Sequence, residues 1–174
     1  MGGDKAVTVI GLVVEQLRAF FGDTAAVQPV GGGTNTVRIL AGDSAVIPEW
    51  LSGEQEACGD CDPYLWVRLV RRWRSGSEFP QELPVAKCGV GRAITVEAGI
   101  ARCFPITDDP TELEQLALVQ LDDSWRIDNA LCLAMAKAER EGVALNTAIG
   151  AGEPIGPEGL AILWVQQASA QLAK

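Results

Sequence analysis

The chain of 174 residues contains five cysteines but no histidine, and this composition limits the chemistry that its side chains can perform. Histidine is the commonest general base and metal ligand, so its absence argues against Ser-His-Asp and Cys-His catalysis. Cys58 and Cys61 have the C-x-x-C spacing with which two thiolates bind one metal ion. Cys88 and Cys103 flank a predicted strand and are the candidates for a third and a fourth ligand.

The sequence leaves three states open for these four cysteines: a structural zinc site, a disulfide formed in a mature extracellular particle, or free thiols. Cys88 and Cys103 do not form a second C-x-x-C motif. A redox C-x-x-C normally opens a helix in a βα unit, whereas this one precedes a strand. The fifth cysteine, Cys132, is expected to be a small buried apolar side chain of a helix. We expect neither a metal nor a cofactor.

Paired carboxylates can perform acid–base or metal chemistry, and the chain has two such pairs. Asp108 and Asp109 precede a proline and are expected to cap a helix, whereas Asp122 and Asp123 are expected to be solvated. Gly31–Gly33 could cradle a phosphate, but no lysine follows and no strand–loop–helix pattern surrounds it. No catalytic residue is predicted, and the protein is not expected to be an enzyme.

An arginine-rich stretch, Tyr64–Arg74, predicts a long strand with two different faces. Simple alternation places Leu65, Val67, Leu69, Arg71 and Trp73 on an apolar face, and Tyr64, Trp66, Arg68, Val70, Arg72 and Arg74 on the other. The predicted antiparallel strand Ala93–Cys103 then places Glu97 across from Arg68 or Arg72. Because arginine is enriched at protein interfaces, the candidates for subunit contacts are Arg68, Arg71, Arg72, Arg74 and Glu97.

The other elements follow from apolar periodicity and capping signals, and together they predict one domain over residues 1–174. A helix is expected over residues 6–21, a short strand over 36–40, a long helix from Asp108 to about Glu141, and a strand over 160–172. The long-helix face traced by Leu113, Ala117, Leu121, Trp125, Asn129, Cys132 and Ala136 is expected to pack. Residues 41–63, 75–92 and 142–159 are predicted to be flexible loops. The predicted fold is therefore α+β: a mostly antiparallel sheet with an N-terminal helix and a long helix packed on one face.

The net charge of −9 makes binding to DNA by bulk charge unfavourable. Apolar residues make up 48% of the chain and charged residues 21%, which is typical of a globular protein. No apolar run reaches the roughly 18 residues that a transmembrane helix needs, so no membrane contact is expected. The N-terminus lacks the basic region and cleavage site of a secretory signal, and we expect folding in a cytoplasm.

Four segments carry a resemblance to a known family: Pro63–Arg74, Phe79–Pro80, Ile94–Cys103 and Leu121–Cys132. With the order of the elements, they resemble the small neck proteins of long-tailed actinobacterial phages, and within that group the tail terminators. The resemblance covers most of the chain, from about residue 5 to the end.

The resemblance implies an α+β subunit of a hexameric ring that caps the tail tube and joins it to the head. The implied partners are the major tail tube protein and a head-to-tail stopper or other neck protein. Genomic DNA would pass through the lumen without sequence-specific binding, and the location would be the virion neck, assembled in the host cytoplasm. The nearest alternative is a head-to-tail stopper or adaptor, and a different class is a zinc-stabilised binding module.

Overall fold

The computed structural model describes residues 3–42, 62–105, 107–158 and 160–174, which form two helices and a five-stranded sheet. The elements are, in chain order, α1 (Lys5–Phe21), β1 (Val37–Leu40), β2 (Tyr64–Arg74), β3 (Arg92–Cys103), α3 (Pro110–Arg140), β4 (Ala144–Glu158) and β5 (Ala161–Leu172). The strand order is β1-β2-β3-β5-β4, with β1 parallel to β2 and every other pair antiparallel. The predicted α+β class is confirmed.

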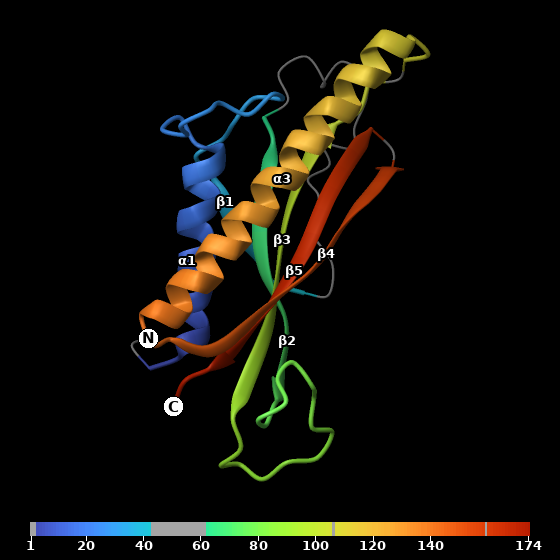
Figure 1. The fold of residues 1–174 in the computed structure, drawn as a ribbon. Coiled ribbons are helices and arrows are strands. Elements are labelled where there is room, and N and C mark those ends of the chain that lie inside the picture. Colours follow the sequence, from blue (N-terminus) through green and yellow to red (C-terminus); the bar gives the residue numbers. More distant parts are fainter. Residues whose placement is uncertain (1–2, 43–61, 106, 159) are drawn as a thin grey trace.

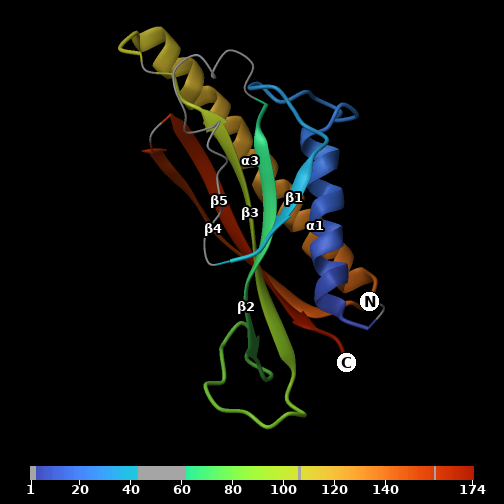
Figure 2. The same ribbon diagram turned by 180° about the vertical axis from the view of Figure 1, so that it is seen from behind.

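Both helices cover the same face of the sheet and enclose the main core (Figures 1 and 2). From α1 this core receives side chains at helical spacing, among them Val9, Val13 and Leu17, and from the sheet the alternate residues of β2 and β3. The opposite face carries a smaller apolar cluster built around Tyr64 and Trp66. Both faces of the central strands are therefore buried, which explains why β3 is buried at ten consecutive positions.

The helix ends lie where the capping residues predict them. The Asp4 carboxylate accepts a hydrogen bond from the backbone N–H of Ala6, and Asp109 does the same for Thr111. Pro110 follows as the first residue of α3, where a missing N–H has no consequence. Gly142 stands just beyond the C-terminal end of α3 with a φ of 67°, a conformation that glycine adopts at little steric cost.

The predicted alternation along β2 is wrong beyond Leu69, because a β-bulge between Leu69 and Arg71 shifts the register against β3. Before the bulge Arg68 lies opposite Glu97, and after it Arg71 lies opposite Thr95 and Trp73 opposite Ala93. Directly paired residues of an antiparallel ladder share a face. Arg71 and Trp73 therefore lie on the face of Trp66 and Arg68, and Arg72 and Arg74 turn to the helix side.

The loop predicted over residues 142–159 is also wrong, because residues 144–158 form the strand β4. Glycine and proline favour turns, but here β4 is an outer strand in which irregular pairing is tolerated. Its register against β5 shifts at three places, including Ile149/Gly152 and Ile155/Glu158. The loop predicted over residues 75–92 agrees with the structure as far as Gly91, since β3 begins at Arg92 and only an isolated bridge joins Ser75 to Glu82. The loop predicted over 41–63 lies mostly outside the described residues.

A close approach between β2 and β3 gives the first prediction. The indole of Trp66 lies on Gly99, where an added Cβ would meet the ring at 2.3 Å. We expect Gly99→Ala to lower the free energy of unfolding by about 1–3 kcal/mol, because the buried indole has no room to move. Urea unfolding followed by circular dichroism measures the change.

The matched control is Gly11→Ala in α1, where an added Cβ meets no atom within 4 Å. Alanine in a helix interior is favoured over glycine by up to about 1 kcal/mol, so this variant should be as stable as the parent or more so. Equal stability of the Gly99 variant and the parent would show that Trp66 does not pack on this glycine.

Candidate functional site

The arginine–glutamate pair predicted across β2 and β3 exists, but it is buried. Arg68 Nε lies 2.6 Å from Glu97 Oε1 and Arg68 Nη2 lies 2.9 Å from Glu97 Oε2, in a two-pronged arrangement. Both side chains are more than nine-tenths buried. The remaining Nη1 of Arg68 donates to the carbonyl oxygen of Gly42 at 3.2 Å. In this structure Arg68 and Glu97 stabilise the sheet of their own chain.

The other predicted arginines lie at the lower end of the molecule in Figure 1, near the connection between β2 and β3. Arg71 pairs with Glu82 at 2.6 Å, and Arg72 pairs with Asp4. The hydrogen bonds from Arg72 and from the Ala6 backbone lower the pKa of Asp4 below its ordinary value. Arg74 donates to the carbonyl oxygen of Val90 at 2.9 Å. The two ion pairs are about half exposed and contribute little to stability, so their arginines can exchange partners at low energetic cost.

Two further arginine–aspartate pairs were not predicted, and the expectation that Asp122 and Asp123 are solvated is wrong. Arg102 Nε lies 2.6 Å from Asp123 Oδ2, with both side chains more than nine-tenths buried. Arg126 Nε lies 2.7 Å from Asp122 Oδ2, one helical turn away along α3. Burial raises the pKa of Asp123, and the Arg102 guanidinium acts in the opposite direction. The i, i+4 spacing of Asp122 and Arg126 was the only sequence signal for either pair.

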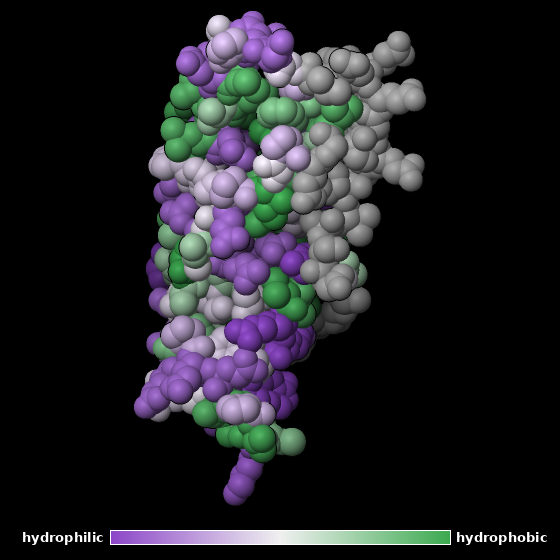
Figure 3. All heavy atoms as spheres, turned by 90° about the vertical axis from the view of Figure 1, so that its right-hand side faces the viewer, coloured by the Kyte–Doolittle hydropathy of each residue, from purple (hydrophilic) through white to green (hydrophobic). Residues whose placement is uncertain are grey.

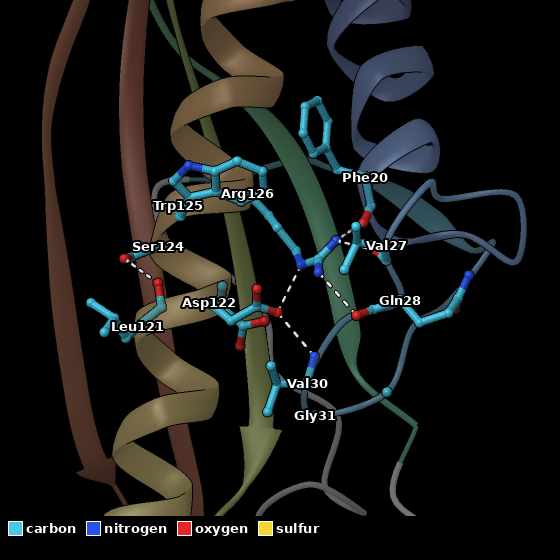
Figure 4. Close-up of polar contacts among 12 residues, drawn as sticks. Phe20, Val27, Gln28, Val30, Gly31, Leu121, Asp122, Ser124, Trp125 and Arg126 are labelled. Atoms are coloured by element: carbon cyan, nitrogen blue, oxygen red, sulfur yellow. Dashed lines mark hydrogen bonds and ion pairs between the residues drawn. The ribbon is translucent and has the colours of Figure 1, made fainter.

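The loop that follows α1 is held by the remaining donors of these arginines, and Figure 4 shows the contacts of Arg126. Arg126 donates to the carbonyl oxygens of Phe20, Val27 and Gln28 at 2.8–3.1 Å. Asp122 accepts a hydrogen bond from the backbone N–H of Val30 at 3.0 Å. Both members of the Arg126–Asp122 ion pair therefore bind the loop to α3.

Two glycines of the same loop, Gly31 and Gly32, contact the second arginine, Arg102. Arg102 donates to the carbonyl oxygens of Gly31 and Gly32. An added Cβ at Gly31 would lie 2.4 Å from Cγ1 of Val119 and 2.9 Å from the Arg102 guanidinium, so a side chain there would require these neighbours to shift. A phosphate cradle presents backbone N–H groups, whereas here the carbonyl oxygens of the loop face a cation.

These ion pairs fix which face of α3 points inward, and it is not the predicted one. The buried positions are Asp123, Arg126, Ile127, Ala130, Leu131, Ala134, Met135 and Ala138. Leu118, Leu121 and Trp125 lie on the outside with 51%, 66% and 56% of their surface exposed. Cys132 is also exposed as a free thiol, contrary to expectation, and partial desolvation together with Asp128 raises its pKa. We call Leu118, Leu121 and Trp125 the outward face of α3.

A groove of about 720 Å³ lies along this outward face, and we call it the α3–β4 groove. Its lining comes from the loop after α1, from α3 and from β4 and β5: Val30, Leu118, Leu121, Asp122, Ser124, Trp125, Asp128, Gly152, Trp164 and Gln166. Figure 3 shows apolar side chains gathered in the upper part of the molecule, at the height of the N-terminal half of α3. Such a surface is typical of a protein-interaction site.

Two buried polar atoms in the groove wall, Nε1 of Trp164 and Oε1 of Gln166, have no hydrogen-bond partner within the described part of the chain. The Trp164 indole lies against Gly152 of β4, where an added Cβ would meet the ring at 2.5 Å. The amide nitrogen of Gln166 is occupied, since it donates to Asp128 and to the Gly150 carbonyl oxygen. Both unpaired atoms are buried within the wall and are not exposed to the groove.

Three of the five cysteines fall within the described residues. Cys103 is disulfide-bonded, whereas Cys88 is an exposed free thiol. Cys58 and Cys61 lie outside the described residues, so the structure says nothing about their spacing motif. Among the residues that the structure describes, no group of three or more His, Cys, Asp or Glu side chains is placed to hold a metal ion.

No protein-family model and no curated protein matches the chain. In the described part of the chain, no helix is long and apolar enough to cross a membrane.

The network around Arg126 gives the second prediction. Arg126→Lys keeps the positive charge but cannot reach Asp122 and three separate carbonyl oxygens at once, since lysine presents a single ammonium group. We expect the free energy of unfolding to fall by about 2–3 kcal/mol, measured by urea denaturation.

Arg140→Lys is the matched control, because Arg140 is exposed in the last turn of the same helix. Its stability should stay within about 0.5 kcal/mol of the parent. If both substitutions have the same small effect, Arg126 does not hold the loop to α3.

Proposed function

We propose that the protein is a structural virion subunit, a tail terminator that forms a hexameric ring, caps the phage tail tube and joins it to the head-completion complex. The observation that carries this proposal is the outward face of α3, three large apolar side chains that stay exposed beside a groove. Large exposed apolar surfaces on one face of a subunit indicate contact with another protein. The sequence resemblance to phage neck proteins supplies the identity of the assembly.

The sheet is also suited to a ring, because its two outer strands differ. β1 has four residues and is parallel to its neighbour, whereas β4 has 15 residues and is antiparallel to β5. A ring requires a heterologous interface, in which one patch meets a different patch on the next subunit. An unpaired strand edge can form hydrogen bonds with another chain. Within the described part of the chain, β4 pairs only with β5, which leaves its outer edge for such a contact.

The subunit-interface candidates divide into two groups under this proposal. Arg68 and Glu97 act inside the subunit, because each is buried and already paired. Arg71 and Arg72 remain candidates for contacts with acidic groups of a neighbour, since their ion pairs are about half exposed. Arg74, half-buried and bonded to loop carbonyls, would instead shape the lower end of the subunit.

The partners under this proposal are the major tail tube protein on one side of the ring and a head-to-tail stopper or other neck protein on the other. The net charge of −9 supports a lumen through which genomic DNA passes without sequence-specific binding. The protein is proposed to have no enzymatic role. A head-to-tail stopper or adaptor is the second candidate, since it would use the same kind of ring with different neighbours.

A zinc-stabilised binding module is less well supported than either ring. A sulfur atom in a disulfide is not the thiolate that zinc requires, so a four-cysteine site that includes Cys103 does not fit this structure. Elemental analysis of the purified protein distinguishes this class directly.

The third prediction concerns assembly. We expect the purified chain to form a hexamer in native mass spectrometry, or to form rings at one end of tail tubes assembled from the tube protein, seen by electron microscopy. A stopper would instead bind a head-side neck protein and leave bare tubes uncapped. A monomer that neither assembles nor binds tubes would contradict the proposal.

Leu121→Asp places a charge on the outward face of α3 and should reduce assembly and tube capping. Val7→Asp is the matched control, because Val7 is also half-exposed on a helix but lies on α1. Both variants should unfold at nearly the same urea concentration as the parent, since neither side chain is buried.

A further inference from the structure

We infer that the connection between β2 and β3, residues Ser75–Gly91, binds in the α3–β4 groove of a second copy of this chain. We call this segment the β2–β3 loop. The inference adds a specific contact to the proposed ring. It rests on the proposed function in one respect, because both require copies of the chain to meet through two different patches.

The β2–β3 loop carries an apolar group that its own chain leaves uncovered. Val85 is 92% exposed, the highest value among the large apolar residues of the described chain, and Leu83 beside it is 38% exposed. The loop projects from the lower end of the molecule, whereas the N-terminal half of α3 lies at the upper end (Figures 1 and 2). The loop and the groove of a single chain are thus too far apart to meet, and a second copy is needed to join them.

The charges of the two ends are complementary. Residues Arg71–Arg92 contain five basic side chains and two acidic ones. Residues Asp108–Trp125 contain six acidic side chains and no basic one, and four of the six acids are exposed. Asp4 neutralises Arg72, and Arg126 and Arg102 neutralise Asp122 and Asp123. These pairs leave a smaller excess of basic charge near the loop and of acidic charge at the start of α3. Opposite charge on two patches favours their association and disfavours contact of either patch with its own kind.

The fourth prediction tests the contact with two variants of the full chain, each defective in one patch. Val85→Asp damages the loop, and Leu118→Asp damages the groove. Each variant alone should self-associate with a dissociation constant at least about tenfold higher than the parent, measured by analytical ultracentrifugation. Val27→Asp is the matched control, because Val27 is a loop residue that is 71% exposed and lies in neither patch.

A mixture of the two variants gives the sharpest readout. Each copy of Val85→Asp keeps an intact groove and each copy of Leu118→Asp keeps an intact loop, so the mixture should form one-to-one dimers that do not grow. Native mass spectrometry with one variant isotopically labelled identifies these dimers. Recovery of pairing in the mixture also shows that both variants are folded.

The inference is overturned if Val85→Asp associates as the parent does, or if the mixture forms no mixed dimers. An intact Val85→Asp hexamer would reject this contact and leave the proposed ring standing. A parent chain that is monomeric at all concentrations would reject the contact, whereas its binding to tail tubes would still support the proposed function.

Discussion

The orientation of α3 depends on two buried arginine–aspartate pairs, Arg102–Asp123 and Arg126–Asp122. Removing charges from water is unfavourable, and the attraction between them compensates only when the remaining donors are also satisfied. Here both guanidinium groups complete their hydrogen bonds on backbone carbonyls of residues 20–32. A rotation of α3 would break this network and leave charges buried without partners. The helix therefore has one stable rotation, in which Leu121 and Trp125 face outward.

The arrangement separates buried charged residues from exposed apolar residues along the chain. Charged residues are placed inside where they fix the helix and the sheet, as Arg68 and Glu97 also do. Large apolar residues of α3 are left outside beside the groove. In a subunit of an assembly this pattern is expected, because the outer apolar surface becomes buried only when a partner binds. The excess of basic charge near the β2–β3 loop and of acidic charge at the start of α3 gives such contacts a direction.

The sequence predicted the elements that local signals define. The ends of α3 followed from Asp109, Pro110 and Gly142, and β2 was predicted with its observed ends because apolar residues and arginines extend without a break from Tyr64 to Arg74. Its faces were predicted only in part, because nothing in the residues around Val70 marks the bulge. The strand β4 was not predicted, because the glycines and prolines of residues 144–158 indicated a loop, although an outer strand tolerates them.

The candidate surface could not be predicted, because it depends on which face of α3 is buried. Periodicity favours the apolar face as the inner one. Here partners distant in sequence, Arg102 on β3 and the carbonyls of the loop after α1, make the face with Asp123 and Arg126 the better inner face. That preference arises only in the folded chain. The same reason explains the wrong expectation for Cys132.

A double-mutant cycle on Arg102 and Asp123 tests most directly whether the buried pairs hold α3 in place. Arg102→Met and Asp123→Leu should each lower the free energy of unfolding by about 3–5 kcal/mol, because each leaves one charge buried and unpaired. The double variant, which removes both charges, should be more stable than the sum of the two losses predicts by about 2 kcal/mol or more. Losses that add to within about 0.5 kcal/mol would contradict the account, since the two side chains would then act independently.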